Sequence, residues 1–319
     1  MTDKIIARIL RETHTPDLLE TLATRLSPTD LQSLLLEVYR QRAEKLTPRD
    51  VLKQYEHNRF VQPAAADPRQ QLEFDRLAYA LLPADAEVME SSPVAPLGSN
   101  SVVATIDQNN AVTTTRNTEV CSDCTNVMAL ECAKRRREVV KHNPQAKGRI
   151  KLCTSQRLTR AQVFSGAATF AHFRILALCT AGQDEGGRKF EIESLVQHID
   201  FYLRLTQACR VAGYKVDQIM VNLTAFDERW QTMLNTSVLE TLATRYPSVE
   251  FAFDQTRETG RGYYYGAGFQ VNMTHSSGEN YFIADGGFTD WTQQYLSNRK
   301  ERLLISGFGS ERFVYVFGD

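Results

Sequence analysis

A glycine-rich turn that carries an arginine lies near the end of the chain. Gly307–Arg312 reads Gly-Phe-Gly-Ser-Glu-Arg. Two glycines let a backbone pass close to a ligand, and an arginine at the start of a helix offers a fixed cation for phosphate. The same run is also typical of an ordinary turn between a strand and a helix, so it predicts a phosphate contact only together with other residues.

A second group of cations lies upstream, on and beside predicted strands. Arg157, Arg160 and Arg174 belong to this group. Arginines on neighbouring strands can hold a phosphate through paired hydrogen bonds. Each of them could equally form a surface ion pair.

Three further segments carry groups suited to a small polar substrate. In Cys121–Thr125 an aspartate and a threonine can bind a substrate ammonium, although Ser122 or Asp123 could instead cap a helix. Thr259–Gln270 has glycines in a predicted strand and three successive tyrosines, of which at least one should face a pocket. Ala284–Asp290 adds two adjacent glycines.

The six cysteines do not form a disulfide framework in a chain of 319 residues, and a reducing cytosol is the simplest setting for them. Cys121 and Cys124 have the spacing of a metal or redox pair. No second pair follows at zinc-finger spacing, which favours buried or pocket-lining thiols over structural zinc. We therefore predict no metal site built from protein ligands.

Composition excludes several classes of protein. The 42% of hydrophobic residues suffices for a sizeable core in one large domain or two. A net charge of −1, from 37 basic and 38 acidic residues, provides no overall attraction to nucleic acid or membrane. No apolar run reaches ~18 residues, and the first residues lack a signal-peptide pattern. We expect a cytoplasmic protein with no membrane partner.

The elements that position these groups fall into two predicted domains. Residues 1–62 should form a helical extension that packs, dimerises or binds a partner. Ser27–Asp30 and Thr47–Asp50 each place Ser or Thr at the N-cap, proline first in the helix and aspartate third, and Thr15–Asp17 is a third start signal. The proline-rich break that begins at Pro63 opens the second domain, residues 63–319.

Hydrophobic periodicity predicts the elements of the second domain. Its helices should cover 72–81, 125–140, 192–212 with a stop at Gly213, and 238–245. Lys134–Arg137 then lies on a solvated helix face or contacts RNA. Hairpin-like spacings favour an α+β fold: a mostly antiparallel six- or seven-stranded sheet flanked by helices. The predicted strands are 102–106, 111–115, 150–153, 173–178, 217–223, 251–253, 266–273, 281–284 and 303–305.

Taken in order, these segments resemble the class II aminoacyl-tRNA synthetase catalytic core, nearest the histidyl-tRNA synthetases and their paralogue, the regulatory subunit of ATP phosphoribosyltransferase. The resemblance covers about residues 70–319. Asp123–Thr125 resembles the substrate-binding D/E-x-T, and Thr159–Gln162 resembles motif 2, F-R-x-E. Tyr263–Gln270 resembles Y-Y-x-G-x-x-F-E, Gly286–Asp290 is similar to G-G-R-Y-D, and Gly307–Arg312 is similar to motif 3.

The resemblance implies a homodimer that binds ATP with Mg²⁺ and a small amino or carboxylic acid. In the implied reaction the acid's carboxylate attacks the ATP α-phosphorus, and Arg160 and Arg312, as the catalytic residues, hold the α- and γ-phosphates. The other ATP-binding residues implied are Gln162, Phe173, Arg174, Gly309 and Glu311. The substrate-binding residues implied are Asp123, Thr125, Cys179, Tyr263, Tyr264, Gly286 and Gly287.

The sequence also departs from the histidyl pattern. Thr259 stands at the position of an activating arginine, Gln162 at that of the motif 2 glutamate, and Ile175 and Cys179 at those of the substrate-reading Gln and Glu. Only a few residues follow motif 3, so we expect no anticodon-binding domain. The retained Arg160 and Arg312 favour adenylate formation, and the altered pocket indicates an acid other than histidine, with a carrier protein, a small molecule or a tRNA as acceptor.

Two alternatives stay open. The chain could be a non-catalytic regulatory subunit that senses a ligand and acts on an enzyme partner. It could also be a plain interaction protein that works through its N-terminal helices.

Overall fold

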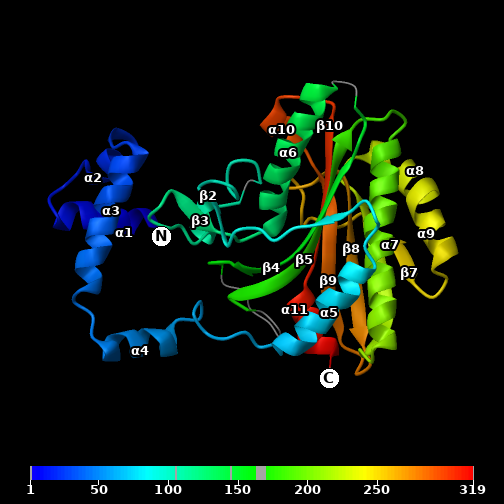
Figure 1. The fold of residues 1–319 in the computed structure, drawn as a ribbon, viewed down its shortest axis with the longest axis horizontal. Helices are drawn as coiled ribbons and strands as arrows, with labels where there is room; N and C mark the ends of the chain where they lie inside the picture. Colours follow the sequence, from blue (N-terminus) through cyan, green and yellow to red (C-terminus); the bar gives the residue numbers. More distant parts are fainter. Residues whose placement is uncertain (1, 105, 144–145, 163–169, 319) are drawn as a thin grey trace. The chain divides into compact units, whose positions relative to one another are not determined.

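The computed structural model of the chain describes residues 2–104, 106–143, 146–162 and 170–318. These residues form two compact units (Figure 1). The first consists of Met1–Gln62 with Thr113–Thr118, and the second of Pro63–Val112 with Glu119–Asp319. The candidate site described below lies within the second unit.

The first unit is helical, and its helices begin where capping residues are placed. Ser27 accepts a hydrogen bond from the backbone N–H of Asp30, and Thr47 forms a reciprocal capping box with Asp50, so the predicted starts of α3 and α4 are confirmed. None of the described side chains of this unit is buried. Its elements are α1 (Thr2–Glu12), α2 (Leu18–Glu20), the π-helical η1 (Thr21–Arg25), α3 (Pro28–Ala43) and α4 (Pro48–His57).

The second unit is built on one sheet with the strand order β1-β4-β5-β10-β9-β8-β6-β7. β1 pairs parallel with β4 and β7 pairs parallel with β6, while all the other neighbours are antiparallel. The strands are β1 (Glu87–Val88), β4 (Ile150–Thr159), β5 (His172–Gln183), β6 (Val216–Ala225), β7 (Glu250–Phe253), β8 (Tyr265–His275), β9 (Asn280–Thr289) and β10 (Glu301–Phe308).

The predicted fold class is therefore confirmed, with eight strands in place of six or seven. The two-residue edge strand β1 escaped prediction because two residues are too few to show an alternating pattern.

Helices cover both faces of the sheet (Figure 1). On one face α5 (Pro68–Ala80), α7 (Lys189–Val211) and α11 (Ser310–Phe317) bury side chains such as Phe74, Tyr202 and Phe313. On the other face α6 (Cys124–His142) and α10 (Trp291–Leu296) bury Met128 and Trp291. The short elements η3 (Glu228–Trp230), α8 (Gln231–Met233), η4 (Leu234–Leu239) and α9 (Glu240–Arg245) add to the α7 side.

The predicted strands at 102–106 and 111–115 are wrong. Residues 101–104 form turns and bends, and Thr105 lies outside the described residues. The cause is the buried carboxylate of Glu119, which accepts hydrogen bonds from the backbone N–H groups of Gly98 and Asn100, each at 3.0 Å, and from Gln108 at 2.7 Å. These local bonds replace strand pairing. The segment instead contains β2 (Val94–Pro96), η2 (Gln108–Asn110) and β3 (Thr118–Val120), and β2 pairs with β3.

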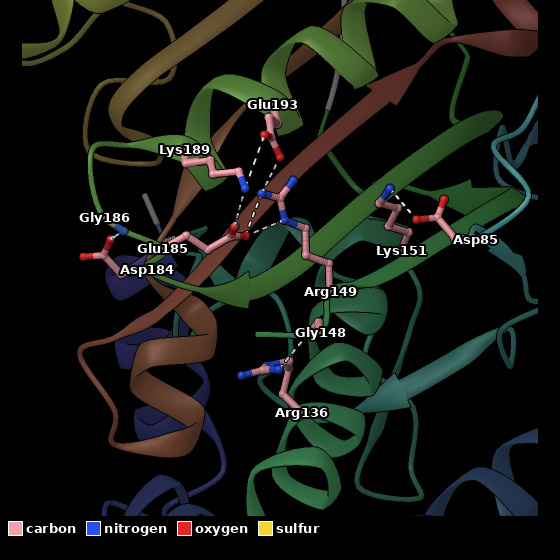
Figure 2. Close-up of polar contacts among 10 residues, drawn as sticks. All are labelled: Asp85, Arg136, Gly148, Arg149, Lys151, Asp184, Glu185, Gly186, Lys189 and Glu193. Atoms are coloured by element: carbon pink, nitrogen blue, oxygen red, sulfur yellow. Dashed lines mark hydrogen bonds and ion pairs between the residues drawn. The ribbon is translucent and has the colours of Figure 1, made fainter. Parts of the chain in front are cut away.

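The basic cluster on α6 is not uniformly solvated, contrary to the prediction. Arg136 is fully buried and donates to both carboxylate oxygens of Glu301, at 2.9 and 3.1 Å. It also donates to the carbonyl of Gly148 at 2.8 Å (Figure 2). Nearby, Arg149 lies between Glu185 and Glu193, with Nη2 contacts of 2.6 and 2.8 Å (Figure 2). These pairs join α6 and the start of β4 to β10 and α7.

Candidate functional site

A cavity of about 640 Å³ lies in the sheet unit and gathers most of the predicted site residues. Its volume suits a small-molecule ligand. The predicted residues that line it come from the start of α6, the end of β4, the start of β5, the loop before β8, and the start of α11: Asp123, Thr125, Arg160, Gln162, Phe173, Arg174, Tyr263, Tyr264, Gly309 and Arg312. Four predicted residues do not line it: Cys179, Gly286, Gly287 and Glu311.

One end of the cavity is suited to an anion. Gly309 and Arg312 line it at the point where α11 begins, so the positive end of that helix faces the same space. The Arg312 guanidinium donates to the carbonyl of Phe282 at 3.1 Å. Burial lowers the pKa of Arg312, a desolvation cost that a bound phosphate would offset.

Two residues predicted to bind ATP, Arg174 and Glu311, make contacts within the fold. The Arg174 guanidinium bonds to Asp75 of α5 and to Ser155, on the sheet face away from Phe173. The buried Glu311 carboxylate accepts from Arg157 and from the backbone N–H of Arg174, both at 2.9 Å, and so holds α11 against β4 and β5.

The cavity lining also carries two carboxylates, Asp123 and Asp285, each paired with an arginine. Asp123 caps α6 through one oxygen, which accepts from the backbone N–H and hydroxyl of Thr125 at 2.9 and 2.8 Å. The second oxygen lies 3.3 Å from Arg160. The same side chain therefore caps the helix and lines the cavity. Arg160 also donates to the carbonyl of Ser122 at 2.9 Å, and its guanidinium lies 5.1 Å from the centre of the Phe173 ring.

Two tyrosines, Tyr263 and Tyr264, form part of the cavity wall. The rings of Tyr263 and Tyr264 meet edge to face at 4.9 Å, and burial raises the pKa of both phenols well above its usual value. The close packing depends on glycine. A Cβ at Gly287 would lie 2.6 Å from the Tyr264 ring, and one at Gly286 would lie 2.5 Å from the Phe269 ring. Both glycines therefore make room for aromatic rings rather than lining the cavity themselves.

Asp285 was missed as a site residue by the sequence analysis. It lines the cavity from β9, and its Oδ1 accepts from Arg257 Nη2 at 2.9 Å. Burial raises its pKa to about 6 despite the neighbouring guanidinium. The signal available in the sequence was its position two residues before Gly287, which places both residues on the same face of the strand.

The departures from the histidyl pattern are visible in the geometry. Ile175 lines the cavity, while Cys179 is buried with its thiol 3.9 Å from the carbonyl of Thr125. Thr259 is exposed, and its carbonyl accepts from Arg257 at 2.7 Å. Ile175 therefore gives this part of the lining an apolar side chain.

The cysteines are all buried, free thiols, and burial raises the pKa of Cys121 to about 12. Across the described ranges no group of three or more His, Cys, Asp or Glu side chains could hold a metal ion. Nor does any helix in those ranges have the length and apolar character needed to cross a membrane.

No known protein family and no curated protein matches this sequence. Solved structures do. The ATP phosphoribosyltransferase regulatory subunit/histidyl-tRNA synthetase from Bacillus halodurans C is 12% identical with a TM-score of 0.56, over 81% of this chain and 83% of that one. Apo histidyl-tRNA synthetase from S. aureus is 10% identical with a TM-score of 0.56, over 80% and 68%. Putative threonyl-tRNA synthetase ThrRS-1 from Aeropyrum pernix is 15% identical with a TM-score of 0.57, over 78% and 58%.

Identities this low establish likeness of fold and leave activity to be argued from the site. The three matches each cover 78–81% of this chain. The chain has a class II synthetase-like fold, similar to that of the histidyl-tRNA synthetases and the regulatory subunit of ATP phosphoribosyltransferase.

Proposed function

We propose that the protein binds ATP and a small amino or carboxylic acid in this cavity and joins them as an acyl-adenylate. One observation carries the proposal: Arg312 at the start of α11 and the Asp123–Arg160 pair at the start of α6 line a single cavity of about 640 Å³. Arg160 also lies over the Phe173 ring. This arrangement suits a triphosphate placed next to an amino acid.

In the proposed reaction an oxygen of the acid's carboxylate attacks the α-phosphorus, and pyrophosphate leaves as the bond to the β-phosphate breaks. Arg160 would stabilise charge on the α-phosphate and Arg312 charge on the γ-phosphate. Asp123 would hold the substrate's α-ammonium. Mg²⁺, which the resemblance implies, would supply further neutralisation of the phosphate charge when bound.

A second candidate function is favoured by specific residues. Thr259 stands where the resemblance implies an activating arginine, and Ile175 and Cys179 are apolar where it implies a Gln/Glu pair. A cavity with these replacements could bind a ligand without reacting. The protein would then be a regulatory subunit with an enzyme partner. The homodimer and the acceptor, whether a carrier protein or a tRNA, also remain predictions.

ATP–pyrophosphate exchange, measured with each amino acid in turn, separates the two functions. Adenylate formation predicts exchange with at least one amino acid, and loss of that exchange in Arg312→Ala. Amino-acid binding without exchange in the wild-type protein would favour the regulatory function. No exchange with any acid, together with an unchanged melting temperature on addition of ATP, would exclude adenylate formation.

A further inference from the structure

We propose that Asp285 selects the substrate's side chain, and that the cavity accepts amino acids whose side chain ends in a cationic nitrogen. This inference rests on the proposed function, since it assigns the substrate class of the same cavity. It goes beyond the resemblance to synthetases, because Asp285 belongs to none of the motif positions on which the resemblance depends.

The first step is that the carboxylate, and not its arginine partner, is presented to the cavity. Asp285 lines the cavity and its side chain is 30% exposed, whereas the Arg257 side chain is 2% exposed and is absent from the lining. A ligand at this end of the cavity therefore meets a carboxylate oxygen.

The second step is that Arg257 holds this carboxylate in place. Its Nη2 donates to Asp285 at 2.9 Å and its Nε to the carbonyl of Thr259 at 2.7 Å. The guanidinium carbon lies 5.6 Å from the Phe226 ring centre and 5.8 Å from that of Tyr264. A carboxylate fixed in this way loses little conformational entropy when a ligand binds to it.

The third step is that hydrocarbon side chains also line the cavity. Ile175, Ile283 and Ile305 contribute hydrocarbon to the lining. A long side chain with a methylene stem and a charged end fits such a surface, because the stem meets the apolar wall and the cation meets Asp285.

The fourth step is a charge balance. Asp123, Asp285, Arg160 and Arg257 sum to zero. A bound substrate with a cationic side chain adds two positive charges, from its α-ammonium and its side chain. Its carboxylate and the ATP α-phosphate add two negative charges, so the site stays neutral. A substrate with an uncharged side chain would leave one negative charge in a partly desolvated space, which is unfavourable.

Titration calorimetry tests the inference on the full-length protein saturated with α,β-methylene-ATP, which cannot form an adenylate. Lysine, ornithine and arginine are compared with norleucine, leucine, glutamine and glutamate. We expect the cationic amino acids to bind at least about 10-fold more tightly than norleucine. Asp285→Asn should lower the lysine-to-norleucine affinity ratio about 10- to 100-fold.

Two further variants sharpen the test. Asp217→Asn, an exposed change on β6, is the matched control and should leave the ratio unchanged. Asp285→Glu keeps the charge but moves it one methylene into the cavity, so it should shift the preference from lysine toward the shorter ornithine. That shift requires a folded protein and therefore cannot come from misfolding.

The outcomes separate this inference from the proposed function when exchange is measured in parallel. Selective lysine binding without exchange would contradict adenylate formation and support the inference. Exchange supported only by uncharged amino acids would support adenylate formation and contradict the inference. A glutamine affinity equal to that of lysine, or an unchanged ratio in Asp285→Asn, would overturn the inference. Failure of every amino acid to bind, together with no exchange on any carboxylic acid, would overturn both.

Discussion

Arginines of the sheet unit occupy two contrasting settings. Arg136 has no exposed side-chain surface, and its guanidinium is engaged by the Glu301 carboxylate and by the carbonyl of Gly148. Arg160 is 30% exposed, faces the cavity, and meets its carboxylate partner, Asp123, at a single distance of 3.3 Å. The first setting is closed, because the charge is matched by buried partners. The second is open, because a ligand can still reach the cation.

This difference shows why a basic residue in a sequence predicts so little by itself. Arg136 belongs to a run of four basic residues that resembles a nucleic-acid-binding face, yet it is part of the interior. Arg160 and Arg312 lie outside any continuous basic run, yet both line the cavity. We define Arg136 and Arg149 as the closed arginines, and Arg160 and Arg312 as the cavity arginines. The comparison predicts that the two pairs affect different properties of the protein.

The largest effect is expected at Arg136. Arg136→Ala leaves the Glu301 carboxylate buried without its main partner, which should lower the free energy of unfolding by about 3–5 kcal/mol. Urea denaturation at pH 7 measures this change. Lys134→Ala, an exposed substitution on the same helix, is the control and should change stability by less than about 0.5 kcal/mol. Equal free energies of unfolding for the two variants would show that the buried pair of Arg136 and Glu301 does not stabilise the fold.

The cavity arginines should change ligand affinity and leave the fold intact. Arg160→Ala and Arg312→Ala are each expected to weaken ATP binding about 10- to 100-fold, since a charge-assisted hydrogen bond contributes about 1.5–3 kcal/mol. Their free energies of unfolding should change by less than about 1 kcal/mol. Fluorescent-nucleotide titration measures the affinity, with the exposed Arg229→Ala as control. Wild-type ATP affinity in both cavity variants would show that the motif assignments are wrong.

His198 extends the comparison to pH. It is buried between Thr180 and Ser306, with hydrogen bonds of 2.9 and 2.8 Å, and burial lowers its pKa to about 3. In the unfolded chain this imidazole is protonated near pH 6.5, whereas in the folded chain it stays neutral down to about pH 3. Its contribution to the free energy of unfolding is therefore fully present above pH 6.5 and is lost as the pH falls toward 3. We expect a loss of about 2 kcal/mol between pH 8 and pH 5.

Urea unfolding of the wild type and of His198→Asn at both pH values isolates this contribution. Asp285, whose raised pKa stabilises the fold as the pH falls below about 6, acts in the opposite direction but is present in both proteins. Its contribution cancels in the difference between them. Parallel pH profiles for the two proteins would contradict a neutral, buried His198.

The smallest effect is expected at Arg149. This side chain is 12% exposed, lies between Glu185 and Glu193, and packs over the Phe190 ring at 5.1 Å. Part of its interaction with Glu193 is solvent-screened, so Arg149→Ala should cost only about 1 kcal/mol. The exposed Arg76→Ala, which removes a pair on the surface of α5, should cost less. If Arg149→Ala lowered the free energy of unfolding as much as Arg136→Ala, the exposure of an arginine would not determine how much it stabilises the fold.

Much of the fold was predictable because local signals determine it. The serine and threonine caps at Ser27 and Thr47 mark helix starts, and Gly213, at a φ of 101°, marks the end of α7. The prediction failed at 102–106, where the apolar pattern of a strand is overridden by the Glu119 carboxylate. Its partner groups are up to 21 residues away along the chain, beyond the reach of any local pattern.

Part of the candidate site was also predictable from local sequence patterns. Asp123, Thr125, Tyr263 and Tyr264 lie in short motifs, and all of them line the cavity. Gly286 and Gly287 were predicted to bind substrate, but their hydrogens make room for Phe269 and Tyr264. Asp285 was missed because its importance depends on Arg257, which lies on a separate loop 28 residues away.

The sequence by itself determined the fold class, the helix boundaries that caps specify, and the residue types available for binding a phosphate and an ammonium. Only the tertiary structure decided which of those residues share a cavity and which are closed by buried partners. The physical reason is range. Capping and periodicity act over a few residues, whereas desolvation and charge pairing depend on groups such as Arg136 and Glu301, which lie 165 residues apart and meet only when the sheet forms.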